Sequence, residues 1–222
     1  DKADSVKVDA LILLGSKDIY QKVAKKANTS WEFVGLIHMM ECGFGFQRGL
    51  HNGEPWDMKT TLVPKGRGPF ESWEDSACDA LTMNHISLPK GNSDSEISEI
   101  AMALEKYNGR GYMRRNVHSP YLWSFSNHGE GVGKYIADGH YDPDAASDQP
   151  GAMVVLGYLR HFEDHLLEII EQTERGIPFL KYNSGQSDQN VRSLQVFINS
   201  LLDFSKPEVI VPWLKERLKL DG

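Results

Sequence analysis

The sequence has few cysteines, no long hydrophobic run and no dense basic cluster, and each of these absences excludes a class of protein. Its 222 residues include only Cys42 and Cys78, which define neither a zinc site nor a disulfide framework; they could pair or remain two buried free thiols. The longest apolar stretches, 34–40 and 152–159, are shorter than the ~18 residues of a membrane-spanning helix. Basic residues form no run longer than a pair such as Arg114–Arg115, which argues against a nucleic-acid partner, because phosphate backbones require a basic face.

The composition is that of a globular protein with an acidic balance. Hydrophobic residues make up 40% and charged residues 25%, and 24 basic against 31 acidic side chains give a formal charge of −7. These values exclude a disordered or collagen-like chain. The chain begins at Asp1 without Met, so a signal peptide would not be visible. We expect a secreted or periplasmic monomer with no membrane span.

Apolar residues recur at helical spacing in several segments. Residues 5–27 predict one or two surface helices, broken at Gly15–Ser16. A long helix is expected from about residue 148, because Pro150 falls at an early helical position. The same patterning predicts further helices over 72–83, 95–107, 191–202 and 213–220.

The segment 31–40 differs from the other predicted helices because its apolar residues fall on every face. Thr29, with Glu32 three residues later, fits a capping box that would start this helix. A helix that is apolar all round is buried. Glu41 follows at its C-terminal end, so the sequence predicts a carboxylic acid carried on a buried helix.

Beyond Glu41 the pattern changes to glycine-rich and threonine-rich segments around Asn52–Gly53. An Asn-Gly pair in this setting predicts a β-hairpin, which we place over 43–63. We therefore expect a mainly α protein with a small β-hairpin. The hairpin would fold back over the helix end and carry two acids and a hydroxyl, namely Glu54, Asp57 and Thr60.

Residues 107–141 lose regular periodicity, yet they hold seven of the 22 aromatic residues. Long irregular segments inside a domain are usually functional, and aromatic rings with Asn and Asp are typical of ligand sites that hold sugars. An aromatic core under the loop is the alternative. The candidate substrate-binding residues are Tyr107, Asn108, Tyr121, Trp123, Asn127, Tyr135 and Asp138.

Glu41 is the strongest candidate for chemistry. Burial raises the pKa of a carboxylic acid because the ionised form loses water, and an acid that stays protonated can donate a proton to a glycosidic oxygen. A role as a helix cap, or as a partner of Arg48, is the alternative. Glu54 or Asp57 would supply a second carboxylate, with Thr60 holding a water; pairs about 5–5.5 Å apart retain configuration and pairs about 6.5–9.5 Å apart invert it.

Signals for metals are weak. His161 and His165 lie one helical turn apart but lack the usual zinc-site order. Asp138, Asp142 and Asp144 depart from the spacing of a calcium loop. We expect no metal and no cofactor.

Two groups of motifs are similar to a bacterial and phage lysozyme family of the lysozyme-like superfamily. In the first, a Glu ending a buried helix is followed by an HNG-acid-Pro turn; in the second, YNG, SPYLW, NH and GKYIADG motifs follow in order. The sequence departs from the family pattern at Gln47 and at Gly129–Glu130. The matching segments are 38–41, 46–55, 107–112, 119–124, 127–128, 133–139 and 141–143.

The resemblance implies a lysozyme-like fold that cleaves the β-1,4 links of peptidoglycan or a related aminosugar polymer. It assigns Glu41 as the catalytic acid, Glu54 as the acid of the HNG turn and Thr60 as a threonine on the return arm. It also divides the chain into a catalytic domain over 1–176 and a helical C-terminal extension over 177–222.

Within this class, the net charge of −7 favours a predator-type lysozyme that prefers deacetylated peptidoglycan, because an acidic surface attracts free ammonium groups. A lytic transglycosylase, a chitosanase and a non-catalytic glycan-binding module are the alternatives.

Overall fold

The computed structural model describes residues 2–83, 87–90, 95–137 and 139–174, with side chains at 95–96 and 164–174 excepted. The chain divides into two units, Asp1–Tyr158 and Leu159–Gly222. The predicted helices over 191–202 and 213–220, and the predicted extension over 177–222, lie outside the described residues.

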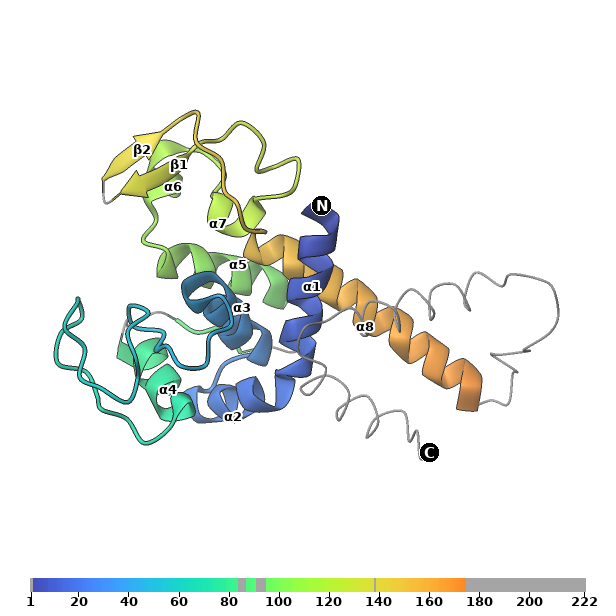
Figure 1. Cartoon of the computed structure of the whole chain (residues 1–222). Helices are drawn as coiled ribbons and strands as arrows, with labels where there is room; N and C mark the ends of the chain where they lie inside the picture. The colour runs from blue at the N-terminus through green and yellow to red at the C-terminus, as the bar shows by residue number, and fades with distance from the viewer. Residues whose placement is uncertain (1, 84–86, 91–94, 138, 175–222) are drawn as a thin grey trace. The chain divides into compact units, whose positions relative to one another are not determined.

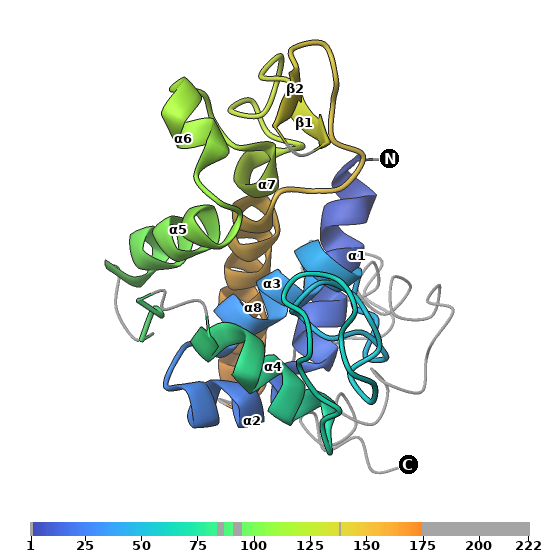
Figure 2. The same cartoon turned by 90° about the vertical axis from the view of Figure 1, so that its left-hand side faces the viewer.

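The first unit begins with three helices: α1 (Lys2–Gly15), α2 (Lys17–Ala27) and α3 (Trp31–Cys42). Two helices over 5–27, as predicted, are confirmed. Helix α3 lies at the centre of the unit, between α1 and a later helix, α5 (Ser95–Tyr107) (Figures 1 and 2). It contacts α1, α2 and α5. At Gly35 a Cβ atom would lie 2.6 Å from Leu13 Cδ2, so α1 and α3 approach closely because this position has no side chain.

The buried character predicted for α3 is confirmed, since every residue from Phe33 to Met39 is buried. The helix begins at Trp31 as predicted, but the predicted capping residue is wrong by one position. Ser30 is the N-cap, and its hydroxyl accepts a 3.2 Å hydrogen bond from the Phe33 N–H. Thr29 instead donates its hydroxyl to the Pro89 carbonyl at 2.8 Å, so it ties the start of α3 to a distant segment.

His38 lies inside an aromatic cluster on α3. Its ring centroid is 4.6 Å from those of both Phe46 and Trp73, and its Nδ1 is 3.0 Å from the Tyr20 hydroxyl. Burial lowers the pKa of His38 to about 4, because a charged imidazolium would lose its hydration. A neutral His38 therefore belongs to the core that anchors α3.

Helices α4 (Trp73–Met83) and α5 (Ser95–Tyr107) occur where the spacing predicts them. The segment 107–141 is less irregular than expected, because it contains α6 (Gly111–Arg115), α7 (Pro120–Trp123), β1 (Lys134–Ala137) and β2 (His140–Asp142). Helix α8 (Ala152–Glu174) begins close to the predicted position and continues into the second unit.

The mainly α class with a small β-hairpin is confirmed, but the hairpin lies elsewhere. Strands β1 and β2 pair antiparallel with Tyr135 opposite Tyr141, and they form the one sheet among the described residues. The hairpin predicted over 43–63 is wrong: the described chain there has a single bridge between Arg48 and Pro55 and otherwise follows an irregular path (Figure 1).

The reason lies in side-chain hydrogen bonds that compete with a strand ladder. The Glu54 carboxylate accepts from the backbone N–H groups of Thr61 and Leu62, which a return strand would use for pairing. The Gly49 N–H donates to the Glu54 carbonyl at 2.8 Å and the Gly53 N–H to the Gly49 carbonyl at 3.0 Å, closing a tight loop. We call residues 48–70 the acidic loop after Glu54 and Asp57, although its four basic residues (Arg48, Lys59, Lys65 and Arg67) outnumber these two acids.

No helix among the described residues combines the length and the apolar character needed to cross a membrane.

Candidate active site

Glu41 lies in the last turn of α3, where the chain leaves the helix through Gly43 in a left-handed conformation with φ of 55°. The Tyr121 hydroxyl donates a 2.8 Å hydrogen bond to Glu41 Oε1. Burial raises the pKa of Glu41, and the bond from Tyr121 opposes this rise without cancelling it. The ion pair with Arg48, the alternative role for this acid, is not formed in the described part of the chain.

The surroundings of Glu41 are crowded and yet open to solvent. The residue retains exposed surface, while the protein around it is dense enough to desolvate the carboxyl. Such a place suits a proton donor, because a ligand can reach the acid and water does not fully solvate it.

Two tyrosines stand beside Glu41, one from each of two helices. Tyr121 comes from α7, and Tyr107, at the end of α5, donates to the Leu50 carbonyl at 2.9 Å. Burial, with the charge of Glu41 as a further cause, raises the pKa of both phenols. Both hydroxyls therefore stay protonated and act as hydrogen-bond donors.

Glu54 has the opposite environment. Its carboxylate accepts from the Thr61 N–H, the Thr61 hydroxyl at 2.6 Å, the Leu62 N–H at 2.9 Å and Asn52 Nδ2 at 2.8 Å. The bonds from Thr61 and Leu62 lower the pKa of Glu54. A Cβ atom added at Gly53 would lie 4.0 Å from the Glu41 carbonyl oxygen, so the turn that carries Glu54 lies against the end of α3.

Thr60 and Asp57 differ from their predicted roles. Thr60 is buried, donates its hydroxyl to the Pro64 carbonyl and accepts a 3.0 Å bond from the Arg67 N–H. Its hydroxyl holds the acidic loop together and is not open to a catalytic water. Asp57 is exposed on the same loop.

Asp79, on α4, is a residue that the sequence reading missed. Its carboxylate accepts from Arg67 Nε at 2.9 Å and lies 2.8 Å from His51 Nε2, and Phe70 stacks on the His51 ring at 5.4 Å. Burial works to raise the pKa of Asp79, but the bonds from Arg67 and His51 outweigh it and lower the pKa. Asp79 thus fastens two points of the acidic loop to a helix.

The other predicted binding residues make contacts of their own. Tyr135 accepts a 3.0 Å bond from Arg115 Nε, the Trp123 ring lies 5.5 Å from that of His128, and Asn108 continues the backbone bonding at the end of α5. Asn127 is exposed. The predicted residues that the structure brings together are thus Glu41, Tyr107 and Tyr121, beside the turn of Glu54.

Asp138 and the side chain of His165 lie outside the described residues. Among the residues that are described, no three His, Cys, Asp or Glu side chains gather in a way that could hold a metal ion.

Both cysteines are free thiols, so the disulfide considered from the sequence is not formed. Cys42 follows Glu41 and is buried, with Sγ 3.6 Å from the Gly49 carbonyl. Burial raises the pKa of Cys42 to about 12, which leaves the thiol unreactive at neutral pH.

No family model, no curated protein and no solved structure matches this chain.

Proposed function

We propose that the protein is a glycoside hydrolase that cleaves β-1,4 links of peptidoglycan, with Glu41 as the general acid. The observation that carries the proposal is the state of Glu41, an accessible carboxyl whose pKa burial raises and whose Oε1 is held by Tyr121. A raised pKa keeps the acid protonated at weakly acidic pH, as protonation of a glycosidic oxygen requires.

The two tyrosines and Glu54 have supporting roles. Tyr121 fixes the carboxyl by one oxygen and leaves the other to face a ligand. The lowered pKa of Glu54 keeps this group ionised, so its negative charge can stabilise a positively charged oxocarbenium ion. Each group then acts in the protonation state that its own surroundings favour.

A lytic transglycosylase is the second candidate. Four donors occupy the Glu54 carboxylate, so Glu54 is poorly placed to act as a second acid or base and Glu41 would act alone. A mechanism that uses one acid and closes an anhydro sugar ring agrees with this arrangement. The products distinguish the two reactions, because hydrolysis gives a reducing end and transglycosylation gives an anhydro end.

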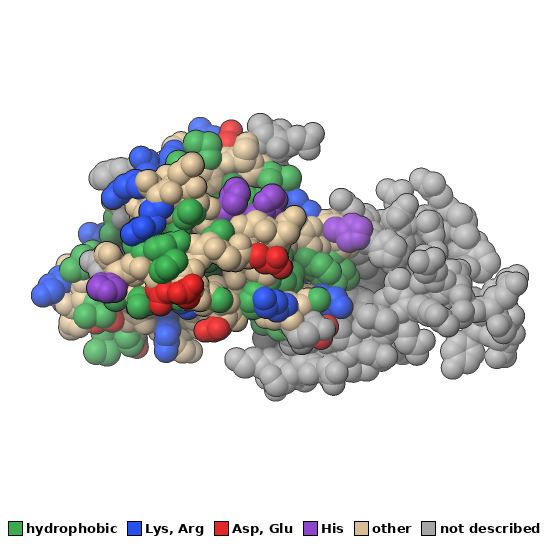
Figure 3. Space-filling model, turned by 90° about the horizontal axis from the view of Figure 1, so that it is seen from above, with side chains coloured by type: hydrophobic (Ala, Val, Ile, Leu, Met, Phe, Trp, Pro, Cys, Tyr) green, Lys and Arg blue, Asp and Glu red, His purple; other side chains and the backbone are tan. Residues whose placement is uncertain are grey.

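We further propose a preference for deacetylated glycan, supported by the net charge of −7. On the face seen in Figure 3 the acidic side chains are dispersed among hydrophobic ones. The net charge supplies a long-range attraction for ammonium groups. Faster release from chemically deacetylated than from fully acetylated sacculi is the expected result, and equal or slower release contradicts it.

The central experiment is digestion of peptidoglycan by the wild type and by Glu41→Gln, with mass spectrometry of the fragments. The variant should release no fragments while it still sediments with the polymer. Glu99→Gln, which alters an exposed acid on α5, is the matched control and should retain full activity. Cleavage by Glu41→Gln at the wild-type rate rules out the assignment.

A further inference from the structure

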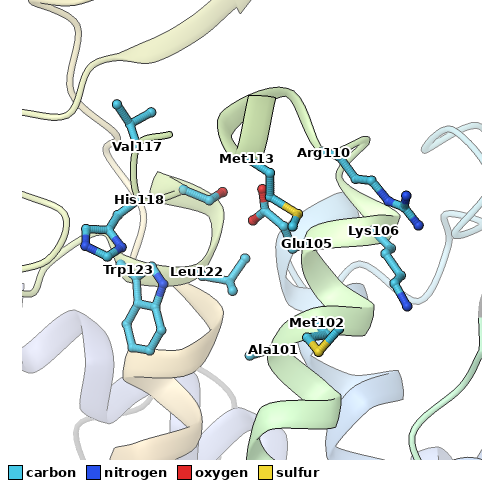
Figure 4. A pocket seen from close by; sticks show the side chains of 11 residues that line it. Ala101, Met102, Glu105, Lys106, Arg110, Met113, Val117, His118, Leu122 and Trp123 are labelled. Atoms are coloured by element: carbon cyan, nitrogen blue, oxygen red, sulfur yellow. The ribbon is translucent and has the colours of Figure 1, made fainter. Parts of the chain in front are cut away.

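A pocket of about 460 Å³ lies between α5, α6 and α7. Met102, Met113, Leu122 and Trp123 provide apolar walls, and the polar residues Glu105 and Ser119 also line it. Figure 4 shows the Glu105 carboxyl between Met113 and Leu122. Its volume falls within the ~300–1,000 Å³ of small-molecule sites.

The pocket and Glu41 face opposite sides of α5. Buried Ile100, Ala103 and Leu104 continue the helical stripe that leads to Tyr107, whose hydroxyl reaches Leu50 beside the α3 terminus. Glu105 lies about 200° around the helix from Tyr107. The same division holds on α7, where Tyr121 bonds Glu41 and Trp123 lines the pocket.

Two polar side chains in this pocket are buried, and one atom of each makes no well-formed hydrogen bond. Glu105 is 8% exposed and Ser119 is 3% exposed. Among the described residues, Glu105 Oε1 and Ser119 Oγ have no hydrogen-bond partner. Burial raises the pKa of Glu105, and hydrogen bonding from the Ser119 hydroxyl and the Met113 N–H opposes this rise. The contact between Ser119 Oγ and Glu105 Oε1 falls short of a well-formed hydrogen bond. A buried polar atom without a good partner destabilises the fold, so a ligand that bonds both atoms recovers that cost.

The rim of the pocket also indicates a ligand. Met102 is 57% exposed and Met113 is 59% exposed, although large apolar side chains are normally covered. Methionine adapts its shape to a bound molecule. Lys106 and Arg110 line the pocket as well, but their charged ends point away from the Glu105 carboxyl (Figure 4).

We propose that this pocket binds the acetamido group of an N-acetylated aminosugar, at a site separate from Glu41. The amide N–H donates to Glu105 Oε1, and the amide carbonyl accepts from the Ser119 hydroxyl. The methyl group packs against Met113 and Leu122, and the sugar ring lies against Trp123. The ligand chemistry follows from the pocket's own groups. A partly deacetylated glycan still carries acetamido groups, so this site and the preference proposed for the Glu41 site act on different units of one polymer.

A neutral amide fits this pocket better than a charged group. An ammonium ion would have to leave water to form a buried ion pair with Glu105, and the desolvation cost offsets the attraction. A ligand carboxylate would meet the charge of Glu105. An amide supplies one donor and one acceptor, and so satisfies both unpaired atoms without burying a second charge.

Methionine methyl NMR can test the proposal, because methionines report on the two sites separately. Met102 and Met113 line the pocket, whereas Met40 precedes Glu41 and Met58 lies on the acidic loop. We expect N-acetylglucosamine to shift the methyl signals of Met102 and Met113 with a roughly millimolar dissociation constant. Glucosamine and glucose at the same concentrations should leave them unchanged.

Two variants complete the test. Ala101→Phe fills the pocket from its lining and removes no hydrogen bond, so it should abolish the shifts; Ser119→Ala should weaken binding about tenfold. Ala146→Phe, at an exposed position after β2, is the control and should bind as the wild type does. Unchanged Met40 and Met58 signals establish that each variant is folded.

Any of the following results overturns the proposal: equal shifts with glucosamine or glucose, no shift of Met102 and Met113 at saturating sugar, or undiminished binding by Ala101→Phe. A shift confined to Met40 also overturns it, because the sugar would then bind at the Glu41 site alone. Cleavage by Glu41→Gln is measured in a separate assay. Failure of the proposed function and failure of this binding proposal can therefore be distinguished.

Discussion

The end of α3 and the acidic loop each carry one glutamate, and the two carboxyls have opposite properties. Glu41 accepts one hydrogen bond among packed tyrosines, and burial raises its pKa. Glu54 accepts from four donors, and these bonds lower its pKa. The same side chain is therefore suited to donating a proton in one place and to holding a negative charge in the other.

The two regions also differ in what holds them. Helix α3 is packed on all sides by apolar residues, whereas the acidic loop is held by polar contacts to Asp79 and by its own side-chain bonds to backbone. Core packing gives the proton donor a fixed position, and polar contacts leave the loop more easily displaced.

The largest expected effect is that of Glu41→Gln, which should lower the cleavage rate by about 10³-fold, since the proton donor is removed. The free energy of unfolding at neutral pH should not fall, because the variant no longer buries an ionisable group. Steady-state kinetics and urea denaturation measure the two quantities. If Glu41→Gln is inactive because it is unfolded, Glu41 supports the fold rather than donating a proton, and this outcome contradicts the role given to it.

Asp79→Asn should lower the free energy of unfolding by about 2 kcal/mol, because it leaves Arg67 and His51 with a weakened acceptor. Urea denaturation measures the change, and Asp18→Asn, at an exposed position on α2, is the control. A loss under 0.5 kcal/mol would mean that the loop does not depend on this anchor.

Glu54→Gln should lower the cleavage rate about tenfold if the carboxylate stabilises positive charge from a distance, far less than the loss at Glu41. It should also remove the contribution of Glu54 to the pH dependence of the free energy of unfolding. The lowered pKa of Glu54 stabilises the fold above its ordinary value, and that stability is lost as the pH falls through the lowered pKa. A rate loss equal to that of Glu41→Gln would make Glu54 a second catalytic group.

Tyr121→Phe should have the smallest effect. The bond from Tyr121 lowers the pKa of Glu41, so its removal should raise that pKa further and move the alkaline limb of the rate profile to higher pH. The rate at the optimum should change only a few-fold. The pH dependence of kcat/KM measures this shift, and a limb that moves to lower pH contradicts the role given to the tyrosine.

Much of the helical framework could be predicted from the sequence. The apolar faces of α1, α2 and α3 repeat at helical spacing, and α4 and α5 fall close to their predicted ranges. Such repeats are visible because burial acts on each helix face locally. Glu41 and its buried helix were found for the same reason.

The acidic loop could not be predicted, because its conformation depends on one side chain. The Asn52–Gly53 turn signal is genuine, but Glu54 captures the N–H groups of Thr61 and Leu62, and this contact has no pattern in the sequence. Asp79 escaped notice because a carboxylate on an amphipathic helix looks like a solvated one. Of the aromatic residues in 107–141, only those that face α3 joined the site.

The alkylation rate of Cys42 can report how often the acidic loop separates from α3. The buried thiol lies 3.6 Å from the Gly49 carbonyl of the loop, so we expect an alkylating reagent to reach it only when the loop separates from α3. Cys78, which is partly exposed, is an internal reference in the same chain. The labelling rate of Cys42 relative to that of Cys78 measures how often the loop opens. A ligand that bridges the loop and α3 would slow the labelling of Cys42 and leave that of Cys78 unchanged.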